Sequence, residues 1–121
     1  MKKYLFLDDM RFPVDVVWIR IPRDVPWDIV RSYDEAVAWV EKNGFPDVVS
    51  FDHDLADAHY MGDFSQERTG YHFAHYLVNR DLDNHDMPDD FQFFVHSMNT
   101  VGARNIKDLL EFYKLKREMY K

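Results

Sequence analysis

Three strand-like runs of this sequence end in carboxylates, imidazoles or a hydroxyl, which are groups that bind metals or transfer protons. The three junctions are Leu7-Asp8-Asp9, Phe51-Asp52-His53-Asp54 and Val95-His96-Ser97. In open parallel α/β sheets, ligands bind at the carboxyl ends of the strands. If the three runs lie parallel, their polar ends therefore converge on one edge of the sheet and form a single site.

The carboxylates in this cluster predict a metal site. Asp8, Asp9 and Asp52 supply hard oxygen ligands, which suit Mg²⁺ or Mn²⁺. Without a cation, mutual repulsion would push at least one of these carboxyls towards its protonated form. We therefore expect a divalent metal, bound by Asp8, Asp9 and Asp52.

The remaining polar residues predict phosphodiester hydrolysis. A bound metal would polarise a phosphoryl oxygen and activate water, while His53 or His96 transfers a proton to the leaving oxygen. Asp54 would orient His53 or act as the base. Ser97 and Asn99, at the start of the last predicted helix, would donate hydrogen bonds to a phosphate. With Asp52 at the metal, the predicted catalytic set is Asp52, His53, Asp54 and His96, and no covalent intermediate is needed.

The elements that position these residues form a predicted α/β domain with a mainly parallel, four-stranded sheet flanked by helices. Strands are expected at 3–7, at 28–31, from 48 to the Asp52 junction and at 91–95. Helices are expected to start at Ser32 or Asp34 and stop at Asn43-Gly44, to open at Thr69-Gly70, and to open at Asn99–Gly102. Residues 14–27 show no helical period, so a crossover helix after the first strand is predicted to be missing or shortened. Residues 56–68 read as a long loop beside the strand ends, suited to a lid or binding loop.

Length and composition place limits on the function. The 121 residues fit one domain, 1–121, and 46% hydrophobic content indicates a folded protein. A net charge of -7 argues against coating of duplex DNA, although a few phosphates of an RNA end remain a possible target. There is no cysteine, and the apolar run near the N-terminus is too short for a signal peptide or membrane span. We expect a cytoplasmic protein with no membrane partner.

Aromatic residues offer a further hypothesis about ligand binding. Core packing is the expected role for most of them, but Trp18 and Trp27 lie in the poorly patterned segment after the first strand. These two are therefore the first candidates for stacking on a nucleobase.

Four motifs together resemble one known family. They are Phe6-Leu7-Asp8-Asp9-Met10-Arg11-Phe12-Pro13, Ser50-Phe51-Asp52-His53-Asp54-Leu55, Thr69-Gly70-Tyr71 and Val95-His96-Ser97-Met98-Asn99-Thr100-Val101-Gly102. In this order they are similar to the cyclic-phosphate-processing receiver-domain family, over Leu5 to about Ile106. The sequence departs from the family at two positions: Ala56 stands where the family often has Gly, and Thr100 where it usually has Pro. Both changes affect loop geometry, and neither removes a charged group.

The resemblance implies a receiver-like α/β fold and an activity on cyclic phosphates in RNA repair or nucleotide signalling. It implies the same site residues, Asp8, Asp9, Asp52, His53, Asp54, His96, Ser97 and Asn99. It adds Arg11, Arg104 and Asn105 as phosphate or site-shaping contacts. The expected substrate is a cyclic nucleotide or a cyclic-phosphate RNA end, and the expected activity is that of a metal-dependent phosphoesterase.

Other functions fit parts of the same pattern. In a phosphoacceptor receiver, Asp8 and Asp9 would bind Mg²⁺ and Asp52 would take phosphate from a histidine kinase, with Ser97 at the hydroxyl position. Such receivers have a fifth strand ending in Lys, for which no candidate follows Ser97. An aspartate-nucleophile phosphatase of the haloacid dehalogenase type would carry its motif after the first strand instead. A non-catalytic module that binds a cyclic nucleotide would keep the phosphate contacts alone, and isolated aspartates can also be loop or helix-cap residues.

Overall fold

A computed structural model gives the structure of the chain and describes residues 1–55 and 68–119. The predicted binding loop, residues 56–68, falls outside the described residues except for Arg68. Among the described residues, no helix combines the length and apolar character that a membrane span requires.

In the part of the chain that the structure describes, four parallel strands form one sheet in the order β2-β1-β3-β4. The strands are β1 (Tyr4–Leu7), β2 (Trp27–Val30), β3 (Val48–Phe51) and β4 (Gln92–Val95). All four predicted strands are confirmed, with ends shifted by about one residue. The last residues of the strands are in register, because Leu7 pairs with Val30 and Phe51, and Phe51 pairs with Val95. The residues that follow them therefore emerge at the same edge, as the sequence predicted.

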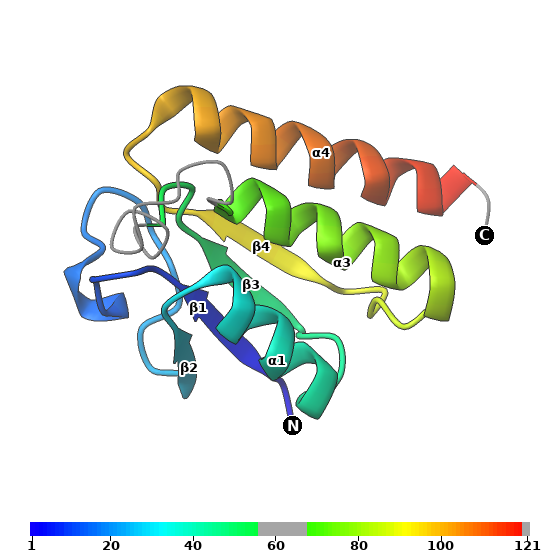
Figure 1. Cartoon of the computed structure of the whole chain (residues 1–121), viewed down its shortest axis with the longest axis horizontal. Coiled ribbons are helices and arrows are strands. Elements are labelled where there is room, and N and C mark those ends of the chain that lie inside the picture. Colours follow the sequence, from blue (N-terminus) through cyan, green and yellow to red (C-terminus); the bar gives the residue numbers. More distant parts are fainter. Residues whose placement is uncertain (56–67, 120–121) are drawn as a thin grey trace.

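Within the described residues, three α-helices pack on one face of this sheet (Figure 1). They are α1 (Tyr33–Asn43), α3 (Gly70–Asn84) and α4 (Thr100–Met119). Ser32, rather than Asp34, caps α1, since its hydroxyl accepts the amide of Glu35 at 3.1 Å. Thr69 caps α3 in the same way, accepting the amide of Tyr71 at 3.2 Å.

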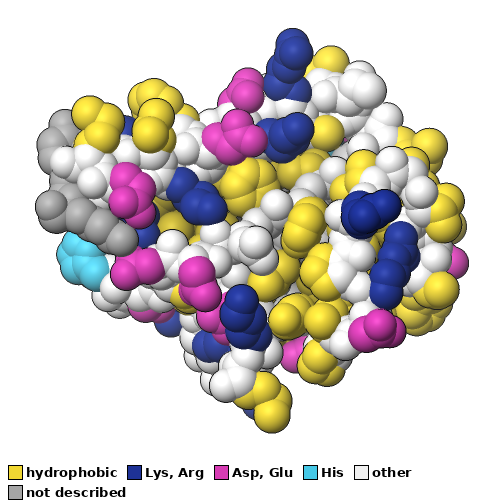
Figure 2. Space-filling view, turned by 180° about the vertical axis from the view of Figure 1, so that it is seen from behind, with side chains coloured by type: hydrophobic (Ala, Val, Ile, Leu, Met, Phe, Trp, Pro, Cys, Tyr) yellow, Lys and Arg dark blue, Asp and Glu magenta, His cyan; other side chains and the backbone are white. Residues whose placement is uncertain are grey.

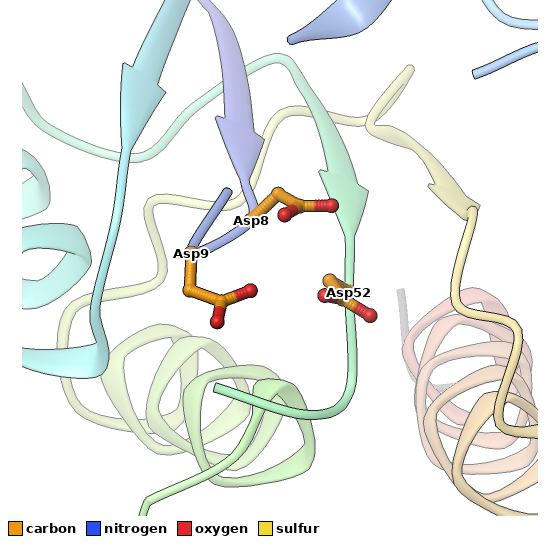
Figure 3. Close-up of side chains that lie close together, drawn as sticks. All are labelled: Asp8, Asp9 and Asp52. Carbon is orange, nitrogen blue, oxygen red and sulfur yellow. The ribbon is translucent and has the colours of Figure 1, made fainter. Parts of the chain in front are cut away.

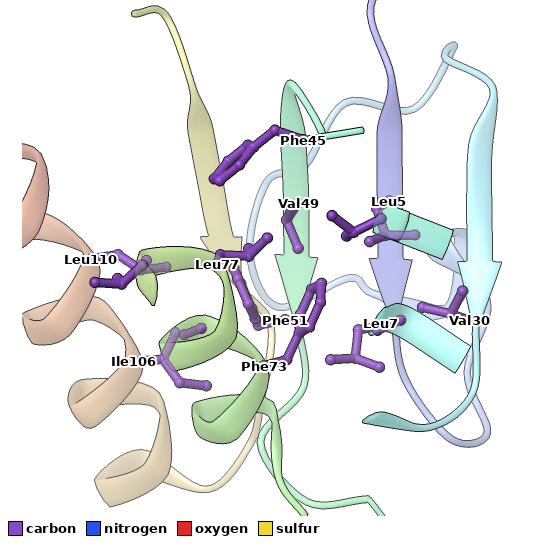
Figure 4. Packing of buried hydrophobic residues seen from close by; sticks show 14 of the residues in the cluster. Leu5, Leu7, Val30, Phe45, Val49, Phe51, Phe73, Leu77, Ile106 and Leu110 are labelled. Atoms are coloured by element: carbon purple, nitrogen blue, oxygen red, sulfur yellow. The ribbon is translucent and has the colours of Figure 1, made fainter. Parts of the chain in front are cut away.

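The main core lies between the sheet and these helices. Alternate strand residues point towards the helices, as Leu5, Leu7, Val49 and Phe51 do in Figure 4. Buried residues of the helices meet them at helical spacing, among them Phe73, Leu77, Ile106 and Leu110. Because these strand and helix side chains are completely buried against each other, the strands are held in position. The edge at which the polar residues emerge is held in position with them.

The opposite face of the sheet is covered differently, because no helix joins β1 to β2. The connection is a short 3-10 turn, Pro13–Asp15, followed by irregular chain. Val16 and Ile21 from this connection are buried against Phe6, which confirms the predicted absence of a crossover helix. Figure 2 shows this side of the molecule, where hydrophobic side chains are visible in a hollow flanked by charged ones. A surface groove is lined by the hydrophobic residues Ile19, Phe93, Phe94 and Leu115, together with Lys, Arg, Asp and Glu side chains.

Gly70 gives a test of how closely α3 is packed onto the end of β3. Its amide donates to the carbonyl of His53 at 2.8 Å, and a Cβ at this position would lie 1.9 Å from the carbonyl oxygen of Asp52. Because that oxygen belongs to the backbone, Gly70→Ala must move the helix or the strand end. We expect the free energy of unfolding, measured by urea denaturation, to fall by at least about 1–3 kcal/mol.

Gly102→Ala is the matched control for this variant. A Cβ at Gly102 would lie 2.3 Å from Cγ of His53, so the imidazole must move; it is a side chain and not backbone, and alanine favours the helix α4. Its loss of stability should therefore be the smaller. Equal losses in the two variants would contradict the close backbone contact at Gly70.

Candidate functional site

Three carboxylates meet at the carboxyl edge of the sheet (Figure 3). Asp8 and Asp9 follow β1, and Asp52 follows β3. One carboxylate oxygen from each lies within 4.8 Å of those of the other two. Asp8 and Asp52 are buried, and Asp9 is half-buried. The three residues predicted as metal ligands are thus brought together.

Asp8 is surrounded by hydrogen-bond donors. Its Oδ1 accepts the backbone amides of Met10 at 2.9 Å and Arg11 at 2.8 Å, and its Oδ2 accepts from Nε2 of His96 at 3.0 Å. Burial by itself would raise the pKa of Asp8, but the hydrogen bonds from His96, Arg11 and Met10 outweigh it and lower this pKa to about 2. Asp8 is therefore a fixed anion at all physiological pH values.

His96 is fully buried and has both ring nitrogens engaged. Nε2 donates to Asp8, and Nδ1 lies 2.7 Å from the hydroxyl of Ser50 in β3. The ring also stacks on Phe6, with centroids 4.6 Å apart. In this position His96 orients Asp8 from behind and does not line the pocket in front of it. Ser50 was not predicted at the site, because it looks like an ordinary residue inside an apolar strand.

The pKa of Asp52 is shifted in the opposite direction to that of Asp8. Burial raises its pKa and the nearby charge of Asp8 raises it further, while His96 offsets part of the effect; the result is a pKa of about 6. Without added positive charge, the cluster thus resists full ionisation. A donor set of three close carboxylates, one of which is poorly stabilised as an anion, fits a hard divalent cation.

A second group of polar residues lies beside Asp52. Nδ1 of His53 donates to Oδ1 of Asp54 at 2.8 Å, and the side-chain amide of Asn99 donates to the same oxygen at 3.2 Å. The hydrogen bond from His53 lowers the pKa of Asp54 despite partial burial. Asn99 also caps α4, since its Oδ1 accepts the amide of Gly102 at 2.9 Å. Asp54 is thus hydrogen-bonded both to His53 and to the residue that caps α4.

These groups surround a pocket of about 270 Å³. Its lining consists of Asp8, Asp9, Met10, Arg11, Asp52, Asp54, Ser97, Met98 and Asn99. The predicted phosphate contacts Arg11, Ser97 and Asn99 are therefore at the site. Arg104 and Asn105 are not: both are exposed on α4, and Asn105 borders a separate surface groove with Tyr71 and Asp108.

Arg11 sits at the rim of this pocket between an aromatic ring and a thioether. Its guanidinium carbon lies 5.1 Å from the ring centroid of Trp18, and its Nη2 lies 3.7 Å from Sδ of Met98. Nη1 is 3.6 Å from Oδ2 of Asp8. The indole of Trp18 donates to the backbone carbonyl of His96 at 2.8 Å. The positive charge of Arg11 is thus held beside the carboxylates.

Comparison with known proteins bears on what this edge does. A family model described as "Cyclic-phosphate processing Receiver domain" matches residues 3–112. No curated protein and no solved structure matches the chain.

The raised pKa of Asp52 gives a prediction about stability in the absence of metal. The pKa of Asp52 is about 6 in the folded protein, against a reference value of 3.8 for the unfolded chain. Its ionisation therefore lowers the free energy of unfolding as the pH rises from the lower pKa through the higher one. Asp52→Asn removes this effect. Relative to wild type, the variant should therefore gain about 1–3 kcal/mol in unfolding free energy between about pH 4 and about pH 7.5, measured by urea denaturation with chelator present.

Asp54→Asn is the control, because it should change stability with the opposite sign. The pKa of Asp54 is lowered, so its charge contributes stability that is present above the reference pKa and lost as pH falls. This variant should be the less stable protein near neutral pH. A difference between Asp52→Asn and wild type that does not change with pH would contradict the assigned state of Asp52.

Proposed function

The chain belongs to the family of cyclic-phosphate-processing receiver domains, and from this premise we propose that it is a metal-dependent phosphoesterase. Its substrate would be a cyclic phosphate on a nucleotide or on an RNA end. The observation that carries the proposal is the cluster of Asp8, Asp9 and Asp52, whose oxygens lie within 4.8 Å of one another. The cluster opens into a pocket that also holds Arg11, Ser97 and Asn99.

The residues divide into a metal-binding and a substrate-binding group. Asp52 and Asp9, supported by the fixed charge of Asp8, would hold Mg²⁺ or Mn²⁺. When bound, such a cation supplies a Lewis acid for a phosphoryl oxygen and lowers the pKa of water. Arg11 offsets negative charge at the rim. The hydroxyl of Ser97 accepts the amide of Asn99 at 3.1 Å and keeps its own proton to donate to a phosphate oxygen.

The proton transfers are assigned to the His53–Asp54 pair. Hydrolysis adds the oxygen of water to phosphorus and breaks one ester bond of the ring, so one proton leaves the water and one reaches the departing ribose oxygen. Asp54 lines the pocket and His53 does not, but Nδ1 of His53 is hydrogen-bonded to Asp54, so the imidazole would act through this carboxylate. His96 lies behind Asp8, and we therefore assign it the role of holding Asp8 in place.

A phosphoacceptor receiver is the second candidate. It is favoured by one observation, the presence of Ser97 in the same pocket as Asp8, Asp9 and Asp52. Phosphotransfer to Asp52 gives no role to the contact between His53, Asp54 and Asn99. We therefore rank the esterase first, and the experiment below includes a test of the alternative.

The test is product formation from 2′,3′-cyclic and 3′,5′-cyclic nucleotides and from RNA with a cyclic-phosphate end. Each is incubated with Mg²⁺, Mn²⁺ or chelator. We expect ring opening that requires metal and is abolished by Asp52→Asn. Mg²⁺ should also raise the melting temperature of the wild type and have no such effect on Asp52→Asn, since a ligand stabilises only the form that binds it.

The other outcomes distinguish the alternatives. Tight binding with no product would overturn the esterase and favour a binding module. Neither binding nor turnover, with labelling of Asp52 by an acyl phosphate, would favour the phosphoacceptor. Turnover by Asp52→Asn at the wild-type rate would remove Asp52 from the mechanism.

His96 gives a separate prediction about the buried support of Asp8. His96→Ala should lower kcat by about tenfold or more and change substrate affinity less, because it removes the donor that holds Asp8. His96→Gln, which keeps an amide donor on a side chain of similar length, should recover part of the rate. If kcat were unchanged in the folded Ala variant, His96 would have only a structural role.

A further inference from the structure

Exposed apolar side chains gather around the mouth of the carboxylate pocket. Met10 and Met98 both line the pocket, yet they are 75% and 65% exposed. Trp18, joined to the pocket through Arg11, is 38% exposed, and Phe12 is also exposed. Single exposed hydrophobic residues need no explanation, but a group of them beside a polar pocket marks a binding surface.

This apolar rim, defined here as Met10, Met98 and the stacked pair Arg11–Trp18, is held in place by specific contacts. Trp18 is anchored by its hydrogen bond to the carbonyl of His96, at the end of β4. The guanidinium carbon of Arg11 lies 5.1 Å from the ring centroid of Trp18, and its Nη2 lies 3.7 Å from Sδ of Met98. The rim is therefore attached to the same strand end that supports Asp8.

Arg31 reinforces the loop that carries the rim. Its Nη1 donates to the backbone carbonyls of Asp8 at 3.2 Å and Arg11 at 2.6 Å, and its guanidinium carbon lies 4.6 Å from the ring centroid of Phe12. Because Arg11 is fixed through its backbone as well as its side chain, little freedom is lost when a ligand binds against it.

The combination of surfaces indicates what kind of ligand fits. The carboxylates suit a metal and a phosphate, whereas thioethers and a guanidinium stacked on indole suit the face of a planar aromatic group. In a nucleotide, a planar base and a phosphate are joined through one ribose. A ligand that presented only phosphate and sugar would leave the apolar rim in water.

We infer that the apolar rim is a nucleobase subsite, so that the ligand of this pocket is a base-bearing cyclic phosphate. The inference rests on the proposed function, which places the phosphate of the ligand at the carboxylates. Met10 and Met98 contact the base directly. Trp18 is a positioning residue, which holds the guanidinium of Arg11 at the rim.

The test compares ligands that differ only in the base. Binding of 2′,3′-cyclic AMP and 3′,5′-cyclic AMP is measured by calorimetry with Mg²⁺, each against the matching ribose cyclic phosphate that lacks adenine. The wild type should bind at least one base-bearing ligand about tenfold or more tightly than its abasic counterpart, as expected for one stacked base. Met10→Ala combined with Met98→Ala should remove most of this preference, because the affinity for the base-bearing ligand should fall much more than the affinity for the abasic one.

The matched control is Val14→Ala combined with Val17→Ala. These two side chains are exposed on the same segment and do not line the pocket, so the preference for the base should remain. Equal affinity for base-bearing and abasic ligands in the wild type would overturn the subsite. So would an equal loss of both affinities in the Met10/Met98 variant.

Trp18 is tested separately for its positioning role. Trp18→Phe keeps an aromatic face under Arg11, whereas Trp18→Leu removes it; the hydrogen bond to His96 is lost in both. Base preference should therefore fall more in the Leu variant, and retention of full preference in both would refute the role of Trp18. Because all of these readouts are binding constants, base-dependent binding without ring opening would overturn the esterase and keep the subsite.

Discussion

The hydrogen bonds that keep Asp8 ionised are the constraint on which the rest of the site depends. They come from two amides in the loop after β1 and from His96 at the end of β4, and His96 in turn meets Ser50 in β3. One buried carboxylate thus joins the ends of three strands. Its permanent charge also contributes to the raised pKa of Asp52. The same contacts that organise this edge therefore concentrate negative charge beside Asp52, and a cation would stabilise that charge.

Much of this arrangement could be predicted from the sequence, because most of the polar site residues come directly after apolar strands. Apolar runs that stop at Asp8, Asp52 and His96 predicted both the parallel sheet and the convergence, and the register of β1, β3 and β4 agrees. Ser50 could not be found in this way. Its partner His96 lies 46 residues away, and the contact exists only because β3 and β4 are neighbours. Arg104 and Asn105 were expected at the site, but α4 carries them along its exposed side past the first turn.

The irregular connection between β1 and β2 explains another part of the site that local patterns could not predict. Residues 13–26 have no periodicity, yet two of their side chains, Val16 and Ile21, complete a small core with Phe6 on the face away from the helices. This packing brings the indole of Trp18 to the carbonyl of His96. A helix in the same place would bury one regular stripe of side chains. Irregular chain instead can bury two residues and still present Trp18, Arg11 and Phe12 near the pocket.

If the proposed function holds, the charges of the pocket predict that cation and substrate favour each other's binding. Asp8, Asp9 and Asp52 would carry three negative charges when ionised, and Arg11 offers one positive charge nearby. A cyclic phosphodiester is itself an anion, so it meets net repulsion in the pocket as long as no cation is bound. A divalent cation would bring the formal charge of these four residues to zero and stabilise the ionised form of Asp52, while Asp54 adds one further negative charge to the pocket lining. Cation binding would therefore reduce the repulsion that opposes the phosphate, and by linkage the phosphate would strengthen the binding of the cation.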